Sequence, residues 1–387
     1  MFNEETVFIL GAGASWHYGC PTGEDLVNEI RKKADKLVID WKRAEAEDNL
    51  TKYIPNYFKK LDNNPKQARD NFIKECELIQ NKLRWINPLS IDLFLETNPD
   101  LQNIGKLLIG LVLLECETEY EMHKGNLNRK TQLISFPDIE NQKRGHVIDV
   151  KKCKDDWCRF IVHEMVSGCS QSCDLLNNKV SFITFNYDVT LENRIYQAIS
   201  QIGYFNNEDK RKFFTRENFV FHVYGQLRNP SFENKLFGTF PRHEDLNYEN
   251  MVKGLNLAWE AAGKLKTIIE SERDSDSSII EEAKKKLKSA AQIFVLGYGF
   301  DSTNNQLLQL NETLRWSREW AIKVCFTNFN NSNRINKHAD AVFLKGSGSE
   351  SFVDKNLIMP NLIRWKPCYE KSIRNVYEAL ELDFDFL

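Results

Sequence analysis

The chain has 387 residues, of which 42% are hydrophobic and 28% charged, and its net charge is −3. With 18 glycines and 10 prolines it falls well below average usage of these residues, which excludes a collagen-like or low-complexity protein, and its apolar content excludes general disorder. The lack of a basic surplus argues against a non-specific nucleic-acid or membrane-surface binder, so we expect neither partner.

The N-terminus and the cysteines bear on the compartment. The first five residues are acidic rather than basic, unlike a secretory leader, and the longest strongly apolar run, 107–114, is far shorter than the roughly 20 residues that cross a bilayer. The nine cysteines are odd in number and widely spaced, in a chain long enough to fold without disulfides. We therefore expect reduced cysteines and a cytoplasmic protein.

The first predicted element is a buried strand at 6–10 that runs into the turn Gly11-Ala12-Gly13. A helix is expected from about Thr22, with Thr22 as N-cap and Asp25 three residues later. From 31 to 177, charged and apolar residues alternate at helical spacing, which predicts helices at 90–95 and 104–117 and a loop over 123–155.

Strand patterns return in the second half of the chain. Strand-like runs, several of them continuously apolar, predict strands at 180–185, 219–224, 292–296, 321–326 and 341–344, with a helix at 278–291. This alternation favours an α/β fold with a Rossmann-like open parallel sheet. We predict a discontinuous domain of residues 1–30 plus 178–387, interrupted by a mainly helical insertion subdomain at 31–177.

The loop Gly11-Ala12-Gly13-Ala14-Ser15 lies between a strand and a helix, where backbone N–H groups can approach a phosphate and Ser15 can add a hydroxyl donor. The dinucleotide fingerprint would have a third glycine at the position of Trp16, and an acidic residue about 20 positions on is missing. An ordinary dehydrogenase is therefore disfavoured, and a purely structural turn is the alternative.

Three polar residues follow or end the next two strands. Asn186 and Asp188 come after 180–185, at the strand end where open α/β sheets bind ligands, although turn chemistry is the alternative for both. His222 lies in the strand 219–224 just before Gly225, which places it near the mouth of the sheet, and a satisfied core histidine is its alternative.

Two later strand ends carry similar signals. Gly297, Tyr298, Gly299 and Asp301 form a second loop where the backbone can approach a ligand closely. Asn328 follows the strand 321–326 and could reach a ribose, with an ordinary loop asparagine as the alternative.

In this order the motifs resemble the sirtuin-like NAD-binding fold, and their wording resembles bacterial sirtuin-like anti-phage NADases. The matching segments are Thr-Phe-Asn-Tyr-Asp at 184–188, His-Val-Tyr-Gly at 222–225, Gly-Tyr-Gly-Phe-Asp at 297–301 and Ser-Ile-Asp-Leu-Phe-Leu at 90–95. The resemblance covers roughly 6–30 and 178–345, and the helical block only at 90–95. It implies a sheet of sirtuin type, with NAD+ as the substrate.

Deacylating sirtuins carry a zinc ribbon between the catalytic His and the second Gly-rich loop, but no cysteine lies between His222 and Gly297. Cys153, Cys158, Cys169 and Cys173 lie earlier, at spacings that make a poor zinc pattern. No zinc is expected, and a zinc-independent protein deacylase is the weaker alternative.

The resemblance implies hydrolysis of the nicotinamide–ribose bond of NAD+ to nicotinamide and ADP-ribose, depleting NAD+ in abortive infection. Asn186 would orient the carboxamide or the water, Asp188 would favour positive charge, and His222 would be the general base. Residues 11–15 and 297–299 would hold the pyrophosphate and ribose. A non-catalytic NAD or nucleotide sensor, or a scaffold subunit, is the alternative from another class.

Such enzymes are held inactive until infection, form oligomers and pair with a second protein, such as a HerA-like ATPase, an Argonaute-like protein or a nucleotide-signalling domain. The chain has no Walker-A motif. We therefore expect a homo-oligomer triggered by another polypeptide, with the block 31–177 and the tail 382–387 as candidate contact surfaces.

Overall fold

The computed structural model describes residues 1–46, 64–125, 157–230, 248–267, 270, 278–311, 322–329, 332–343 and 363–370. Most of the predicted 123–155 loop, Cys153 and the tail 382–387 lie outside these residues.

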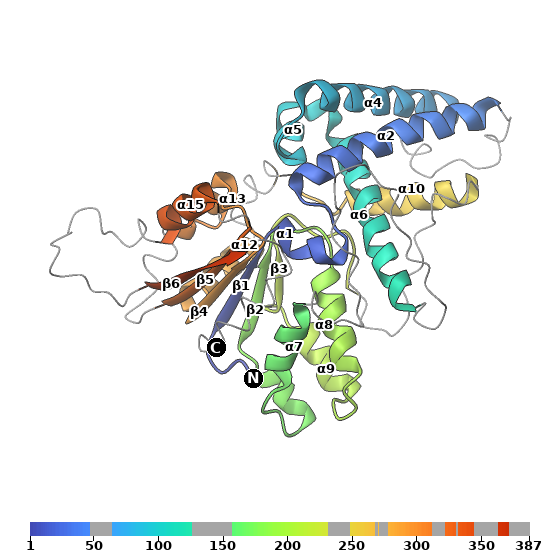
Figure 1. Ribbon diagram of the computed structural model, residues 1–387. Coiled ribbons are helices and arrows are strands. Elements are labelled where there is room, and N and C mark those ends of the chain that lie inside the picture. The colour runs from blue at the N-terminus through green and yellow to red at the C-terminus, as the bar shows by residue number, and fades with distance from the viewer. Residues whose placement is uncertain are drawn as a thin grey trace.

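The centre of the molecule is a six-stranded sheet in the order β3-β2-β1-β4-β5-β6, in which every neighbouring pair is parallel (Figure 1). The strands are β1 (Thr6–Leu10), β2 (Val180–Thr184), β3 (Val220–His222), β4 (Gln292–Leu296), β5 (Ile322–Phe329) and β6 (Ile363–Glu370). This is the strand order of doubly wound dinucleotide-binding folds. The prediction of an α/β fold with an open, Rossmann-like parallel sheet is confirmed.

β1 lies in the middle of the sheet and is buried on both faces. Thr6 pairs with Val180 of β2 on one side and with Gln292 of β4 on the other, so β1 lies between two strands that both follow it in the chain. Phe8 stacks between Phe182 and Phe294, with ring centroids 5.1 and 5.0 Å away. These three aromatic rings pack the central strands together on one face of the sheet.

Helices cover both faces of the sheet (Figure 1). Phe8 and Leu10 face the core shared with α7 (Cys158–Val166), α8 (Thr190–Ser200) and α9 (Asn207–Phe214). Val7 and Ile9 face the opposite core, shared with α12 (Ser278–Ser289), α13 (Ser302–Leu307) and α15 (Asn333–Phe343). The alternation along β1 therefore sends successive side chains into two separate cores.

A helical layer lies over the carboxyl ends of the strands (Figure 1). It contains α2 (Gly23–Ala46), α4 (Pro65–Ile86), α5 (Ile91–Thr97), α6 (Gln102–Gly125) and α10 (Tyr248–Ala262). α2 packs on α4 and α6, and α10 packs on α6 although it follows β3 in the chain. The predicted helices at 90–95 and 104–117 are confirmed, and the Ser90 hydroxyl caps α5 by accepting the Leu93 N–H at 3.2 Å.

One predicted strand is wrong. Residues 341–344 were expected to form a short strand, but 341–343 are the last turn of helix α15. Ala339 and Val342 are buried and Ile335 packs against the same core, so the apolar residues recur at helical spacing. The partner of β5 is β6, which contains Pro367 and lies at the edge of the sheet, where proline is tolerated.

The strand 321–326 was expected to end before Asn328. In the structure β5 continues to Phe329, and Asn328 lies within it, in register with Tyr369 of β6. The continued pairing with β6 extends the strand, so Asn328 belongs to the ladder rather than to the loop after it.

Candidate active site

A chain of polar side chains lies where β1 and β2 end. β1 leads into α1 (Ala12–Ser15), and β2 leads into the loop with Asn186 and Asp188. The Asn186 Nδ2 donates to the Gly11 carbonyl oxygen at 3.0 Å and to the Ser15 Oγ at 2.9 Å. The Ser15 hydroxyl donates in turn to the Asp188 Oδ1 at 3.1 Å. Three residues singled out from two distant motifs therefore form one hydrogen-bonded chain.

His222 joins this group from the end of β3, where it is in register with Thr184 of β2. Its Nδ1 lies 3.1 Å from the carbonyl oxygen of Asn186, and its Nε2 lies 2.7 Å from the Oε1 of Glu192 on α8. Both side chains of the His222–Glu192 pair are buried, with exposed fractions of 6% and 4%. Both ring nitrogens thus face acceptors, an arrangement that favours the doubly protonated imidazolium.

Burial and neighbouring charge shift the pKa values of this group. Burial alone would lower the pKa of His222, but the charge and hydrogen bond of Glu192, together with the Asn186 carbonyl, raise it above its usual value. Burial raises the pKa of Asp188, while hydrogen bonds from Thr190 and Ser15 oppose the shift. Shifted titratable groups at a strand end are typical of active sites.

A small cavity adjoins the cluster, with a volume of about 10 Å³, enough for about one water molecule. The Trp157 Nε1 donates to the Ala14 carbonyl oxygen at 2.9 Å, and the Cys158 N–H donates to the Tyr18 hydroxyl at 3.1 Å. These bonds fix the positions of Trp157 and Tyr18, which both line the cavity. The lining residues are Leu10, Ala14, Ser15, Tyr18, Trp157, Thr184, Asn186, Asp188, Leu191 and Glu192.

The helical layer reaches the same loop through Glu117 of α6. Its Oε1 accepts the N–H of Val189 at 2.9 Å, and its Oε2 lies 2.7 Å from the Nη2 of Arg228. Burial raises the pKa of Glu117 to about 7, although Arg228 opposes the shift. A buried carboxylate thus ties the helical layer to the loop that carries Asp188.

Glu117 is expected to make stability depend on pH. Its pKa of about 7 in the folded chain exceeds the usual 4.5, so between these values the folded state binds more protons than the unfolded state. The free energy of unfolding therefore falls as pH rises through this window. Relative to Glu117→Gln, the wild type should gain about 2 kcal/mol between pH 7.5 and pH 5 in urea unfolding. A difference that stays constant across this range would contradict the assignment.

The glycines of the first loop pack against the loop after β4. The Gly13 N–H donates to the Gly297 carbonyl oxygen at 3.0 Å. A Cβ on Gly11 would lie 2.5 Å from that oxygen, and a Cβ on Gly297 would lie 2.1 Å from the Ala14 nitrogen. Gly299, by contrast, has open space around it. Gly11, Gly13 and Gly297 are therefore needed for contact between the two loops, whatever they do toward a ligand.

The rest of the β4 loop supports its own conformation. Tyr298 stacks on Phe185 with ring centroids 5.2 Å apart, and its hydroxyl donates to the Asn305 Oδ1 at 2.8 Å. Asp301 caps α13 by accepting N–H groups from its first turn. The structure thus brings Ser15, Asn186, Asp188 and His222 together, whereas Tyr298 and Asp301 make contacts of their own.

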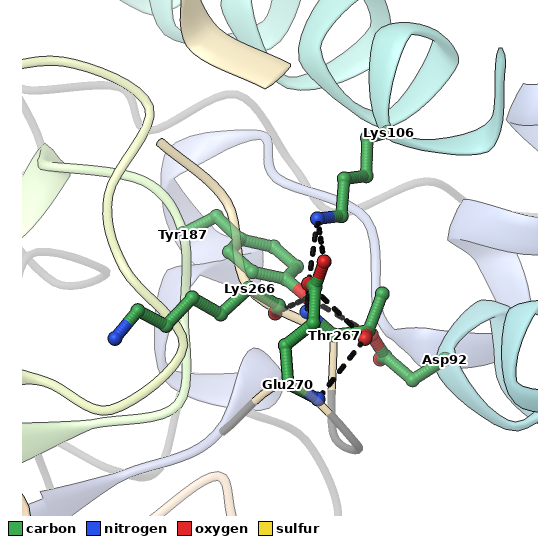
Figure 2. A network of polar contacts seen from close by, with 6 residues as sticks. All are labelled: Asp92, Lys106, Tyr187, Lys266, Thr267 and Glu270. Atoms are coloured by element: carbon green, nitrogen blue, oxygen red, sulfur yellow. Dashed lines mark hydrogen bonds and ion pairs between the residues drawn. The ribbon is translucent and has the colours of Figure 1, made fainter. Parts of the chain in front are cut away.

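A second polar network lies between the β2 loop and the helical layer (Figure 2). The Tyr187 hydroxyl donates to the Asp92 Oδ1 at 2.8 Å. The Lys106 Nζ lies 2.6 Å from the Oε2 of Glu270, which also accepts the N–H of Thr267 at 2.7 Å. Burial raises the pKa of Asp92. The aspartate of the 90–95 segment therefore anchors the helical layer to the residue between Asn186 and Asp188.

Glu192 and Glu117 were not among the residues predicted from the sequence. Glu192 lies in the first turn of the helix that follows the β2 loop, among residues that are mostly buried. Its place there could have marked it, because a glutamate in the first turn of a buried helix needs a partner. Glu117 carried no comparable signal, since its partners are far away in sequence.

The cysteines show no metal arrangement in the part of the chain that the structure describes, where no cluster of three or more His, Cys, Asp or Glu residues could hold a metal ion. Cys158 is buried in the core beside the sheet, and the Cys169 thiol donates to the Met165 carbonyl oxygen at 3.4 Å. Both have structural surroundings.

Comparison of the chain with protein-family models, curated proteins and solved structures found no match in any of the three. Among the helices of the described residues, none has both the length and the apolar character needed to span a membrane.

Proposed function

We propose that the chain is an NAD+ hydrolase that cleaves the bond between nicotinamide and ribose. The observation that carries this proposal is the hydrogen-bonded chain Asn186–Ser15–Asp188 beside His222, at the carboxyl ends of three adjacent parallel strands. Open α/β sheets bind ligands at this edge, next to the point where the strand order reverses. The resemblance to sirtuin-like NADases supplies the choice of substrate.

The residues suit the charge that such a reaction develops. When the C1′–N bond breaks, its electron pair stays with the ring nitrogen, so nicotinamide leaves as a neutral molecule. Water then adds to C1′, and one proton is released. Asp188 would stabilise the cationic ribosyl centre from a preorganised position. Electrostatic stabilisation of the transition state is usually the largest single contribution to catalysis. Asn186 would orient the carboxamide or the attacking water, and His222 would accept the proton.

The size of the cavity sets a condition on this mechanism. Its polar groups fit an amide, a hydroxyl and a developing cation, but it has room for about one water and not for a nicotinamide ring. Binding of nicotinamide at this point therefore requires side chains that line the cavity to move. His222 must also exchange its contact with the Asn186 carbonyl for a substrate or water oxygen before it can act as a base.

The second candidate is a sensor or scaffold subunit that binds NAD or a related nucleotide without cleaving it, and such a subunit would need the same rearrangement of the cavity. On the resemblance, a second protein such as a HerA-like ATPase would raise the activity of a homo-oligomer above that of the isolated chain during infection.

Incubation of the purified chain with NAD+ tests the proposal, with nicotinamide and ADP-ribose followed by chromatography. We expect both products in equal amounts, and His222→Ala should reduce their rate of formation by roughly 10²–10⁴-fold. Calorimetry on the same samples measures binding. Binding without product would favour the sensor. A protein that neither binds NAD+ nor forms product would contradict both candidates.

A further inference from the structure

Glu192 is a buried carboxylate for which the proposed mechanism has no role. It lies in the first turn of α8, lines the cavity and is 3% exposed. Its Oε1 meets the Nε2 of His222 at 2.7 Å. Its Oε2 is buried and has no hydrogen-bond partner among the described residues.

Fold stability does not explain this arrangement. Burying two ionisable groups costs desolvation that a single contact barely repays, and apolar residues of similar volume are often as good or better. An unsatisfied carboxylate oxygen adds to that cost. A buried ionisable pair with an unpartnered carboxylate oxygen beside a cavity is more typical of a site that transfers protons.

The geometry assigns different tasks to the two ring nitrogens of His222. The Nε2 faces a carboxylate, which holds a proton there, while the Nδ1 faces only the neutral carbonyl of Asn186 at 3.1 Å. The carbonyl is the weaker partner, so the Nδ1 is the nitrogen that can be released.

We propose that Glu192 is a positioning residue for His222. In the neutral form of His222, Glu192 holds the remaining ring proton on Nε2, so that Nδ1 is the basic nitrogen that takes the proton from the attacking water or a ribose hydroxyl. The imidazolium so formed is stabilised by the Glu192 carboxylate and then loses its Nδ1 proton to solvent. This role rests on the proposed NAD+ hydrolysis.

Other charged groups surround the pair. Asp188 faces His222 from the β2 loop, and Glu117 of α6, paired with Arg228, faces Glu192. All of them remain in a Glu192→Gln variant. A change in the titration of His222 in that variant therefore reports the charge of Glu192 itself.

The first test is the pH profile of NAD+ hydrolysis by Glu192→Gln. Loss of the carboxylate should move the acidic limb of kcat/KM to lower pH by about one unit and lower kcat at least about tenfold, with little change in KM. Glu192→Asp keeps the charge and should keep the limb near its wild-type position. Glu208→Gln, the same change on the exposed surface of α9, should alter neither. A lower kcat with an unmoved limb would reduce Glu192 to a structural residue.

The second test needs no turnover. The imidazole nitrogens of His222, assigned by their loss in His222→Ala, are titrated by NMR in the wild type and in Glu192→Gln. We expect a pKa above the usual histidine value in the wild type and a lower one in the variant. An unchanged pKa would overturn the inference, whereas the expected change without NAD+ cleavage would overturn only the hydrolase. If Glu192→Gln does not fold, Glu192→Asp and the wild-type titration decide: a wild-type pKa at or below the usual value would overturn the inference.

Discussion

Replacement of Asn186 by alanine is expected to lower kcat for nicotinamide release by roughly 10²–10³-fold, the usual cost of removing one preorganised hydrogen-bonding group from a reacting site. The amide donates to both the Gly11 carbonyl and the Ser15 hydroxyl, so its loss also releases Ser15 from its position against Asp188. The cost to the free energy of unfolding should be only about 1–2 kcal/mol, because a few hydrogen bonds at a partly exposed loop are lost. Steady-state kinetics with thermal unfolding would separate the two effects.

Two further variants make this result specific. Ser15→Ala leaves the Asn186 amide in place but removes a donor from Asp188, so its activity should lie between those of the wild type and Asn186→Ala. Asn28→Ala makes the same chemical change on α2, where the amide donates to the Glu24 carbonyl one turn earlier, and should leave kcat unchanged. An Asn186→Ala protein that is folded and retains full turnover would remove Asn186 from the mechanism.

The sheet could be predicted from the sequence because its strands are buried on both faces. The runs 180–184 and 292–296 are buried throughout and mostly apolar, a pattern that the sequence shows directly. The strand predicted at 341–344 is wrong because a short apolar stretch fits a strand or the buried side of a helix equally well, and 341–343 belong to helix α15. Strand β6 was not predicted because its Pro367 argues against a strand. Proline is tolerated there because β6 lies at the edge of the sheet.

The site was predictable as far as strand ends could be recognised. Asn186, Asp188 and His222 each follow or end a strand, and parallel strands bring their carboxyl ends to one edge. Glu192 could not be predicted in the same way, because its contact with His222 depends on how α8 packs against β3. The two residues are 30 positions apart in the chain. For the glycine loops, the sequence indicated the right residues but only one of their possible roles. Their sequence suggested approach to a ligand, whereas the structure also shows them approaching each other.

Replacement of Gly297 by alanine is expected to destabilise the fold by about 3 kcal/mol or more, independently of any ligand. Gly297 has φ +58°, a left-handed conformation that costs energy for any residue with a Cβ. The added Cβ would lie 2.1 Å from the Ala14 nitrogen and 2.4 Å from the Gly13 carbonyl carbon. Both are backbone atoms, so relief requires the loops after β1 and β4 to separate.

Such a separation would disturb more than one contact. The Gly297 N–H donates to the Thr327 hydroxyl of β5 at 2.8 Å, and its carbonyl accepts the Gly13 N–H, so the residue joins three strand ends. Gly299→Ala is the matched control, because its Cβ would meet nothing within 4 Å, and its unfolding should change by less than about 1 kcal/mol. Urea unfolding of both variants measures the difference. Equal stability of the two would mean that the loops do not touch as described, and the glycines would then be free to serve a dinucleotide alone.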